Sequence, residues 1–255
     1  MAIGMLARAW WDRLRGRLEP RAYPFAEAAL LETPLRQLFA SPQRILCAFD
    51  LKPGERVLEI GPGIGHYSLE AARRIGRRGR LTCLDIQGEM LLETRRRLRA
   101  AGIEGAGSIQ ASAEDLPFAA DSFDHVLAVT VLGEIPDRSR ALREIRRVLR
   151  AGGRLSVSEQ LPDPDFITPG TLRRQLHAAG FVEEATRRHF LLAYTSTWRV
   201  GKEGVRQPAP LQGEVGTSER TATGTVKAAM AAPRSVVVES PLGEKALVLG
   251  DRGSR

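Results

Sequence analysis

Cysteine and aromatic residues are scarce in this chain, and each shortage narrows what the protein can be. The 255 residues include two cysteines, Cys47 and Cys83. Two distant cysteines give neither a disulfide framework nor the spacing of a metal site, so we expect no metal and a reducing, cytoplasmic setting. Aromatic residues make up 5% of the chain, and none interleaves with the arginines of 138–150, as base stacking would require. We therefore do not expect nucleic acid as the substrate.

Long apolar runs are also missing, and no stretch reaches the length of a membrane-spanning helix. Residues 5–18 combine four arginines with leucines and with Trp10 and Trp11. This pattern fits a basic amphipathic helix in peripheral contact with an anionic membrane surface, on its inner face. Its commoner use is a helix that packs its tryptophan side on the main domain. Both interpretations stay open at this point.

Positive charge is in excess, with a formal net charge of +8, yet lysine occurs at only four positions. An arginine bias over the whole chain is explained equally well by the base composition of the coding DNA and by a functional adaptation. Along 138–150 the arginines surround the helix, and Glu144 can pair with Arg140 or Arg147. We interpret this segment as a solvated helix face.

The chain divides into three parts by composition. Residues 1–45 contain leucines, phenylalanines and four prolines, and we predict a helical segment that covers the substrate. Residues 46–200 alternate strand and helix patterns, which predicts a mostly parallel sheet with helices on both faces and an antiparallel addition at its edge. Residues 201–255 are rich in glycine, threonine, alanine and proline, and we predict a flexible tail, since such a segment buries little apolar surface.

Eleven elements are predicted within the middle part. The expected strands are 56–60, 80–85, 108–110, 123–129, 154–159, 181–186 and 189–195. The expected helices are 67–75, 89–101, 138–150 and 169–179. In the tail, 235–239 and 246–249 are weaker strand candidates.

A glycine-rich turn follows the first strand, with glycine at every second position: Gly61, Gly63 and Gly65. Glycines so spaced let the backbone bend sharply and bring a ligand against the main chain. Glu59 precedes the turn by two residues. A carboxylate there would repel a pyrophosphate but suits a cationic ligand such as a sulfonium with an amino group, which favours S-adenosylmethionine.

The second strand ends in Asp85, about twenty residues beyond the glycine turn. An acid at this place can accept hydrogen bonds from both hydroxyls of a ribose, in nicotinamide enzymes as well. Two further segments, 113–118 and 122–124, fall where strands begin or end, and 147–149 precedes the pair Gly152-Gly153. Open α/β sheets place their ligands at the rim where the strands end.

Together these motifs resemble the class I S-adenosylmethionine-dependent methyltransferases, in particular the small-molecule subgroup called methyltransferase type 11, over roughly residues 45–195. The resemblance implies a Rossmann-like, seven-stranded sheet whose last strand is antiparallel. It also implies that the three glycines face the methionine part and that Glu59 organises its amino group. Further implied cofactor contacts are Asp85 to the ribose, Ile86 and Met90 beside the adenine, Ala113 and Glu114 at its polar edge, and Val129 and Thr130 after the fourth strand.

Two residues are weak catalytic candidates: His66, directly after the glycine turn, and Glu134, after the fourth strand. Glu134 also fits a first-turn acid that favours the next helix dipole. Methyl transfer from a sulfonium mainly requires alignment, so no base is assigned. The expected reaction is transfer to a small, hydrophobic acceptor. Two alternatives remain, a non-catalytic S-adenosylmethionine-binding regulator or partner protein and an NAD(P)-dependent oxidoreductase, and the oligomeric state is open.

Overall fold

One sheet of seven strands forms the centre of the molecule. The computed structural model describes residues 41–161, 163, 165–189, 193–201, 237–239 and 245–247. The strand order is β3-β2-β1-β4-β5-β7-β6. The strands are β1 (Arg56–Ile60), β2 (Arg80–Asp85), β3 (Gly107–Gln110), β4 (Phe123–Val129), β5 (Leu149–Gln160), β6 (Phe181–His189) and β7 (Ala193–Val200). Strands β1 to β5 pair in parallel, while β7 runs antiparallel to both neighbours. The predicted fold class is confirmed.

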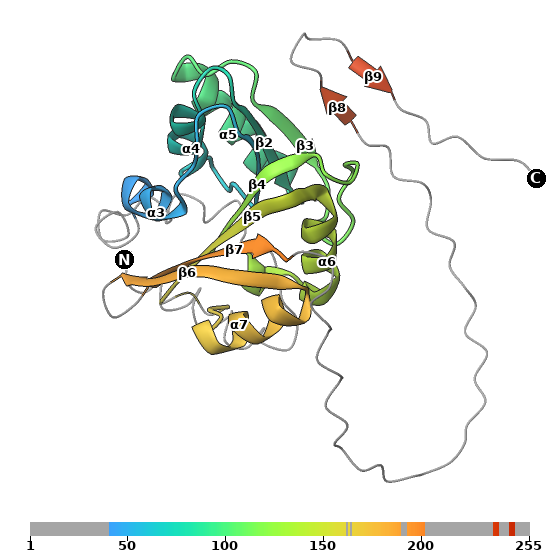
Figure 1. Cartoon of the computed structure of the whole chain (residues 1–255). Helices are drawn as coiled ribbons and strands as arrows, with labels where there is room; N and C mark the ends of the chain where they lie inside the picture. Colours follow the sequence, from blue (N-terminus) through green and yellow to red (C-terminus); the bar gives the residue numbers. More distant parts are fainter. Residues whose placement is uncertain are drawn as a thin grey trace, which may run out of the picture.

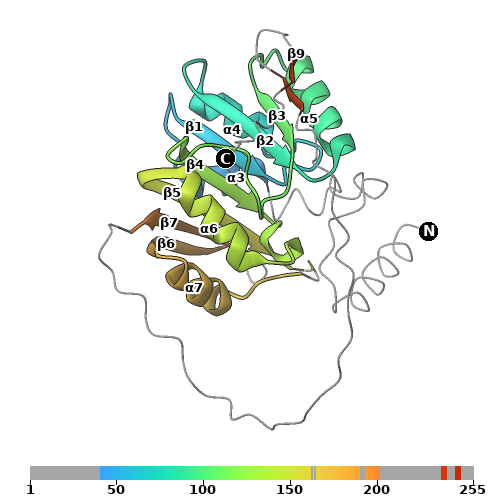
Figure 2. The same cartoon turned by 90° about the vertical axis from the view of Figure 1, so that its right-hand side faces the viewer.

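Helices cover both faces of this sheet, as the parallel strand pairs require (Figures 1 and 2). They are α3 (Pro42–Phe49), α4 (Ser68–Ile75), α5 (Gly88–Ala100), the short 3₁₀ helix η3 (Leu132–Glu134), α6 (Arg138–Val148) and α7 (Pro169–Ala178). The first three pack on one face, where Phe49, Ala71 and Leu98 share a buried cluster. On the other face α6 and α7 lie side by side, and Ile145 and Leu176 join the larger cluster.

Three of these helices begin at a polar cap that the sequence supplies. The side chains of Ser41, Asp137 and Thr168 accept hydrogen bonds from backbone N–H groups in the first turns of α3, α6 and α7. Pro42 occupies the first position of α3, where a missing N–H costs nothing. A proline often ends a helix, but Pro42 begins one. Helix α3 therefore crosses the domain boundary that the sequence predicts between residues 45 and 46.

The last two strands differ from the prediction. β6 continues to His189, and β7 spans Ala193–Val200 rather than 189–195. The reason is that β7 buries polar side chains on both faces, including Ser196 and Thr197, so the alternation expected of a half-exposed strand is absent. The hydroxyl of Ser196 accepts a hydrogen bond from Trp198 Nε1 at 2.6 Å, and that of Thr197 pairs with Ser156 at 3.0 Å.

Most of the two terminal segments falls outside the described residues. This holds for the whole of residues 1–40, and with them for the predicted substrate-covering segment and membrane-surface helix. In the predicted tail the structure describes a short antiparallel pair, β8 (Val237–Glu239) and β9 (Lys245–Leu247). Within the described part of the chain no helix has the length and apolarity to cross a membrane.

Candidate functional site

A pocket of about 260 Å³ opens at the carboxyl ends of the parallel strands. This is the rim at which open α/β sheets bind ligands. Of the predicted cofactor residues, seven line it: Gly61, Gly63, Asp85, Ile86, Ala113, Val129 and Thr130. Both catalytic candidates, His66 and Glu134, line it as well. The structure therefore brings segments that follow β1, β2, β3 and β4 to one cavity.

The glycine turn has the backbone that its sequence predicts. Gly61, Gly63 and Gly65 all have positive φ angles, of 65°, 56° and 82°. A Cβ on Gly61 would stand 2.5 Å from Val131 Cγ2, so only glycine fits there. From below, the hydroxyl of buried Thr94 donates to the carbonyl oxygen of Gly63 at 2.7 Å. Thr94 fixes the turn from the neighbouring helix α5, which no motif of the sequence indicates.

Asp85 ends β2 inside the pocket and is 8% exposed. One carboxylate oxygen accepts the Gln87 N–H at 2.9 Å. Burial raises the pKa of Asp85, although backbone N–H groups of Gln87, Gly63 and Ile86 oppose that rise. The side chain of Asp85 thus links the second strand to the glycine turn. The next residue, Ile86, presents an apolar side chain that is 56% exposed.

Glu59 lies behind the glycine turn and not on the pocket lining. It is 2% exposed, and its carboxylate accepts the Ser68 hydroxyl at 2.5 Å, with Cys83 Sγ at 3.7 Å. Burial, reinforced by the negative charge of Asp85, raises the pKa of Glu59 to about 7. In this arrangement Glu59 ties β1 to the first turn of α4, and its predicted role in organising the amino group of the cofactor stays a prediction.

Three other predicted cofactor residues also lie off the lining: Gly65, Met90 and Glu114. Met90 is buried against Ile64, beneath the turn. The carboxylate of Glu114 accepts the backbone N–H of Asp137 at 2.7 Å and so faces the start of α6. The direction of each of these side chains is decided by tertiary packing.

The described lining of this pocket is acidic. Asp85, Glu134 and Asp163 line it, and its described lining residues include no arginine or lysine, in a chain with a net charge of +8. A buried carboxylate without a cation favours a positively charged ligand. The lining therefore fits a sulfonium nucleoside and disfavours the pyrophosphate of a dinucleotide.

Sequence reasoning missed two acids, one near the end of β5 and one beyond it. Glu159, near the end of β5, is 1% exposed, and Asp163 lines the pocket. An acid near the end of a predicted strand was the signal that singled out Asp85, and the same signal was present at Glu159. Among the described residues no group of three or more His, Cys, Asp or Glu side chains could hold a metal ion.

Comparisons with known proteins agree with this geometry. Residues 58–157 match the family model described as "Methyltransferase domain". Two relatives, from Vibrio vulnificus (strain YJ016) and Rhizobium meliloti (strain 1021), are each named "Ubiquinone/menaquinone biosynthesis C-methyltransferase UbiE". They are 41% and 43% identical over 109 and 105 residues. The matches span 42% and 41% of this chain, and the same shares of the relatives' own lengths.

Solved structures share the fold at low sequence identity. A methyltransferase from Aquifex aeolicus, titled as dependent on S-adenosylmethionine, superimposes with a TM-score of 0.66 at 18% identity, covering 70% of this chain and 100% of that one. The [4+2]-cyclase SpnF superimposes with a TM-score of 0.59 at 18% identity, covering 77% and 93%. The sheet order, the glycine turn and the matched domain agree, and over residues 58–157 the chain is similar to the class I S-adenosylmethionine-dependent methyltransferases, whose cofactor is S-adenosylmethionine.

Proposed function

We propose that this protein transfers a methyl group from S-adenosylmethionine to a small, largely apolar acceptor by direct displacement. The observation that carries the proposal is the pocket, in which a glycine turn with positive φ angles meets acidic side chains and no described arginine or lysine. When bound, S-adenosylmethionine supplies an electrophilic methyl group on a positively charged sulfur.

The residues of this chain would hold the cofactor in an ordered way. Backbone groups of Gly61 and Gly63 would face the methionine part, because no Cβ obstructs them. Asp85 would accept hydrogen bonds from the ribose, Ile86 would lie beside the adenine, and Ala113 would lie at its polar edge. The apolar side chains of the lining exclude water, and alignment of two reactants in such a space contributes on the order of 7–11 kcal/mol in the best intramolecular models.

An apolar acceptor is supported by the remaining walls of the pocket. Val131, Ile135 and Pro136 line it beyond the glycine turn. Relatives that match part of the chain are named as C-methyltransferases of ubiquinone and menaquinone biosynthesis. The chain aligns with only about two fifths of those relatives, so a quinone-like acceptor is part of the proposal.

Two measurements test the proposal. Isothermal titration calorimetry with S-adenosylhomocysteine should show binding, while NAD and NADP should not bind. Incubation with S-adenosylmethionine carrying a radiolabelled methyl group and an extract of apolar metabolites should then give a labelled product. Binding of NAD without binding of the sulfur ligand would replace this assignment by the oxidoreductase alternative.

A second candidate is a protein that binds the cofactor without transferring its methyl group. The observation in its favour is that one fold relative is titled as a cyclase, and a shared fold does not fix a reaction. Cofactor binding with no labelled product from any acceptor class would support it. The cytoplasmic setting remains a prediction, and membrane contact through residues 5–18 concerns residues outside the described part.

A further inference from the structure

We propose that a groove between helices α6 and α7 is a second binding site, which takes a small soluble ligand that carries a phosphate group. The groove is open to solvent and has a volume of about 1480 Å³. Its described lining shares no residue with the lining of the cofactor pocket. The inference goes beyond methyl transfer, because neither the residues of the groove nor its ligand follow from the cofactor site.

The groove lies at the amino ends of the parallel strands, opposite the cofactor pocket. Asp121 precedes β4, and Leu149, Ala151 and Gly152 belong to the start of β5. Strand β7 runs antiparallel to β5, so its last residue, Val200, reaches the same end. Side chains of α6 and α7, which lie side by side on one face of the sheet (Figure 2), complete the lining. A ligand in the groove would therefore not compete with the cofactor for space.

Five arginines and one acid give the described lining a positive charge. The arginines are Arg143, Arg146 and Arg147 of α6, Arg174 of α7 and Arg199 of β7, and the acid is Asp121. Two of the arginines are neutralised by carboxylates, Arg147 by Glu144 and Arg199 by Glu184. The other three form no ion pair with a residue of the described part of the chain. A concave surface that gathers uncompensated cations favours an anionic ligand.

Arg146 is the cation of the groove whose position is fixed in advance. Its guanidinium lies against Gly180, the residue before β6, where an added Cβ would stand 3.0 Å from Nε and 3.2 Å from Cζ. Gly180 has a φ of 84°, so both its backbone and the space beside Arg146 require glycine. The Nε of Arg146 is buried and has no hydrogen-bond partner among the described atoms. A buried donor without an acceptor is costly, and an oxygen of a bound anion would complete it.

Gln175 adds a second polar group without a partner to the same groove. Its Oε1 lies on α7, is buried, and has no hydrogen-bond partner within the described part of the chain. A glutamine amide offers an acceptor oxygen and two N–H donors. It can therefore accept from a hydroxyl of the ligand or, with the amide turned over, donate to a phosphate oxygen. The neighbouring helices thus each contribute one buried group that a ligand would satisfy, which a helix face in contact with water alone does not require.

The arginines decide which anion fits. A guanidinium presents parallel N–H donors that match the oxygens of a phosphate or a carboxylate. The unpaired charges of Arg143, Arg146 and Arg174 suit a phosphate ester or a pyrophosphate better than a carboxylate, which carries a single charge. The described lining contains no aromatic side chain, so it does not provide the stacking that single-stranded nucleic acid needs. A concave site around a half-buried Arg146 fits a small soluble ligand better than the flat surface of a membrane.

Inorganic pyrophosphate is a defined probe for this groove. Isothermal titration calorimetry on the full chain at physiological ionic strength should show binding at one site. In Arg143→Gln/Arg174→Gln the affinity should fall by about tenfold or more, because charge-assisted hydrogen bonds are lost. Arg77→Gln/Arg78→Gln changes the net charge equally at two exposed arginines outside the groove. This control should weaken binding by less than about twofold, because salt screens distant charges.

A third variant tests the buried donor. Arg146→Lys keeps the charge but removes the Nε–H and the planar fork, so it should weaken pyrophosphate binding by about threefold or more. Saturating pyrophosphate should leave the affinity for S-adenosylhomocysteine unchanged, since the two ligands bind at opposite ends of the sheet. Circular dichroism confirms that each variant is folded.

Several results would overturn the site. Equal losses in the groove and control variants would mean attraction by net charge alone, and wild-type affinity in Arg146→Lys would remove the buried donor from the site. Competition between pyrophosphate and S-adenosylhomocysteine would place the probe in the cofactor pocket. A wild type that binds vesicles of phosphatidylglycerol but not pyrophosphate would replace the small ligand by a membrane surface. None of these results decides the proposed function, which the titration with S-adenosylhomocysteine alone tests separately.

Discussion

The two ends of strand β1 carry the same residue type in opposite electrostatic states. Glu55 precedes the strand, and its carboxylate pairs with Arg154 at 2.7 Å and lies 3.6 Å from His125 Nδ1. Although burial opposes ionisation, contacts with His125, with the Lys52 N–H and with Arg154 lower the pKa of Glu55 to about 2. Glu59, four residues later, has the uncharged partners Ser68 and Cys83 and no cation partner among the described residues, and burial raises its pKa to about 7.

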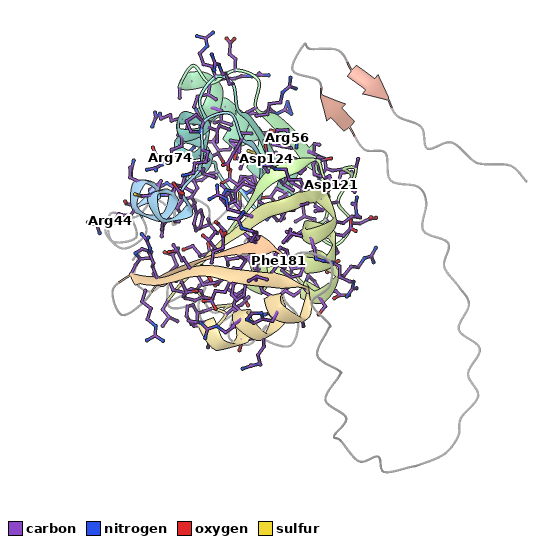
Figure 3. All side chains as sticks on the ribbon, in the orientation of Figure 1. Arg44, Arg56, Arg74, Asp121, Asp124 and Phe181 are labelled. Atoms are coloured by element: carbon purple, nitrogen blue, oxygen red, sulfur yellow. The ribbon has the colours of Figure 1, made fainter. Side chains whose placement is uncertain are left out.

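The contrast extends beyond the two glutamates. At the amino end, Asp124 accepts from Arg56 and Arg150, and Arg56, Asp121 and Asp124 lie close together in Figure 3. The pKa of Asp124 is lowered despite its partial burial. At the carboxyl end, burial raises the pKa values of Asp85 and Glu159. The protein supplies its own cations at one end, and we infer that the cofactor supplies one at the other.

Glycines at the two ends offer the largest expected effect. Gly61 and Gly54 both have positive φ, but a Cβ on Gly54 meets nothing within 4 Å, whereas one on Gly61 overlaps Val131. Gly54→Ala should cost about 1–2 kcal/mol for its backbone conformation alone. Gly61→Ala should cost about 2–5 kcal/mol through added overpacking and should abolish binding of S-adenosylhomocysteine. Urea denaturation measures the stabilities, and equal losses at the two positions would contradict the packing at the turn.

The second largest effect is expected when the charge of Glu55, at the amino end of β1, is removed. Glu55→Gln leaves Arg154 without its carboxylate and should lower the free energy of unfolding by about 3 kcal/mol at pH 7. Because the pKa of Glu55 is lowered in the folded state, its contribution is present above about pH 4.5 and is lost as the pH falls toward about 2. Wild-type and variant stabilities should therefore converge in acid, and a constant gap down to pH 2.5 would count against this assignment.

Glu59→Gln should have the opposite sign. Because the folded-state pKa of Glu59 is raised, the protonated acid stabilises the fold below about pH 4.5, and this contribution is lost as the pH rises through about 7. The amide keeps an acceptor for Ser68, so the variant should match wild type near pH 4.5. At pH 7.5 it should be more stable by on the order of 2 kcal/mol. Chemical denaturation at several pH values checks this, and a destabilised variant at pH 7.5 would mean that Glu59 has a cation partner.

The smallest effect is expected at Asp85. Asp85→Asn keeps an acceptor but removes the charge, so the affinity for S-adenosylhomocysteine should fall about tenfold, or roughly 1.4 kcal/mol. Asp50→Asn at the amino end, which removes an exposed partner of Lys52, serves as the control and should leave affinity unchanged. An unaltered affinity in a folded Asp85→Asn variant would remove this side chain from the ribose site.

The sequence was sufficient for the sheet and for most of the pocket. Strands β1, β2 and β4 have the predicted bounds, because continuous apolar runs ended by turn residues are unambiguous. Gly61, Gly63 and Asp85 line the pocket, since their positions follow from backbone geometry. Glu59 and Glu114 do not, because the direction of a side chain depends on partners such as Ser68 and Asp137 that come from elsewhere in the chain. The predicted bounds of β7 were wrong because its polar side chains are buried, and their burial also depends on partners from elsewhere in the chain.

Hydrogen–deuterium exchange of the full chain, with and without S-adenosylhomocysteine, tests the difference between the two ends most directly. Binding at the acidic rim predicts slower exchange in peptides that cover residues 60–67, 84–87 and 129–136. Peptides from the amino ends of the same strands, around residues 52–56 and 121–124, should be unaffected. Protection at the amino ends, or protection at the acidic rim by NAD and not by S-adenosylhomocysteine, would contradict the account.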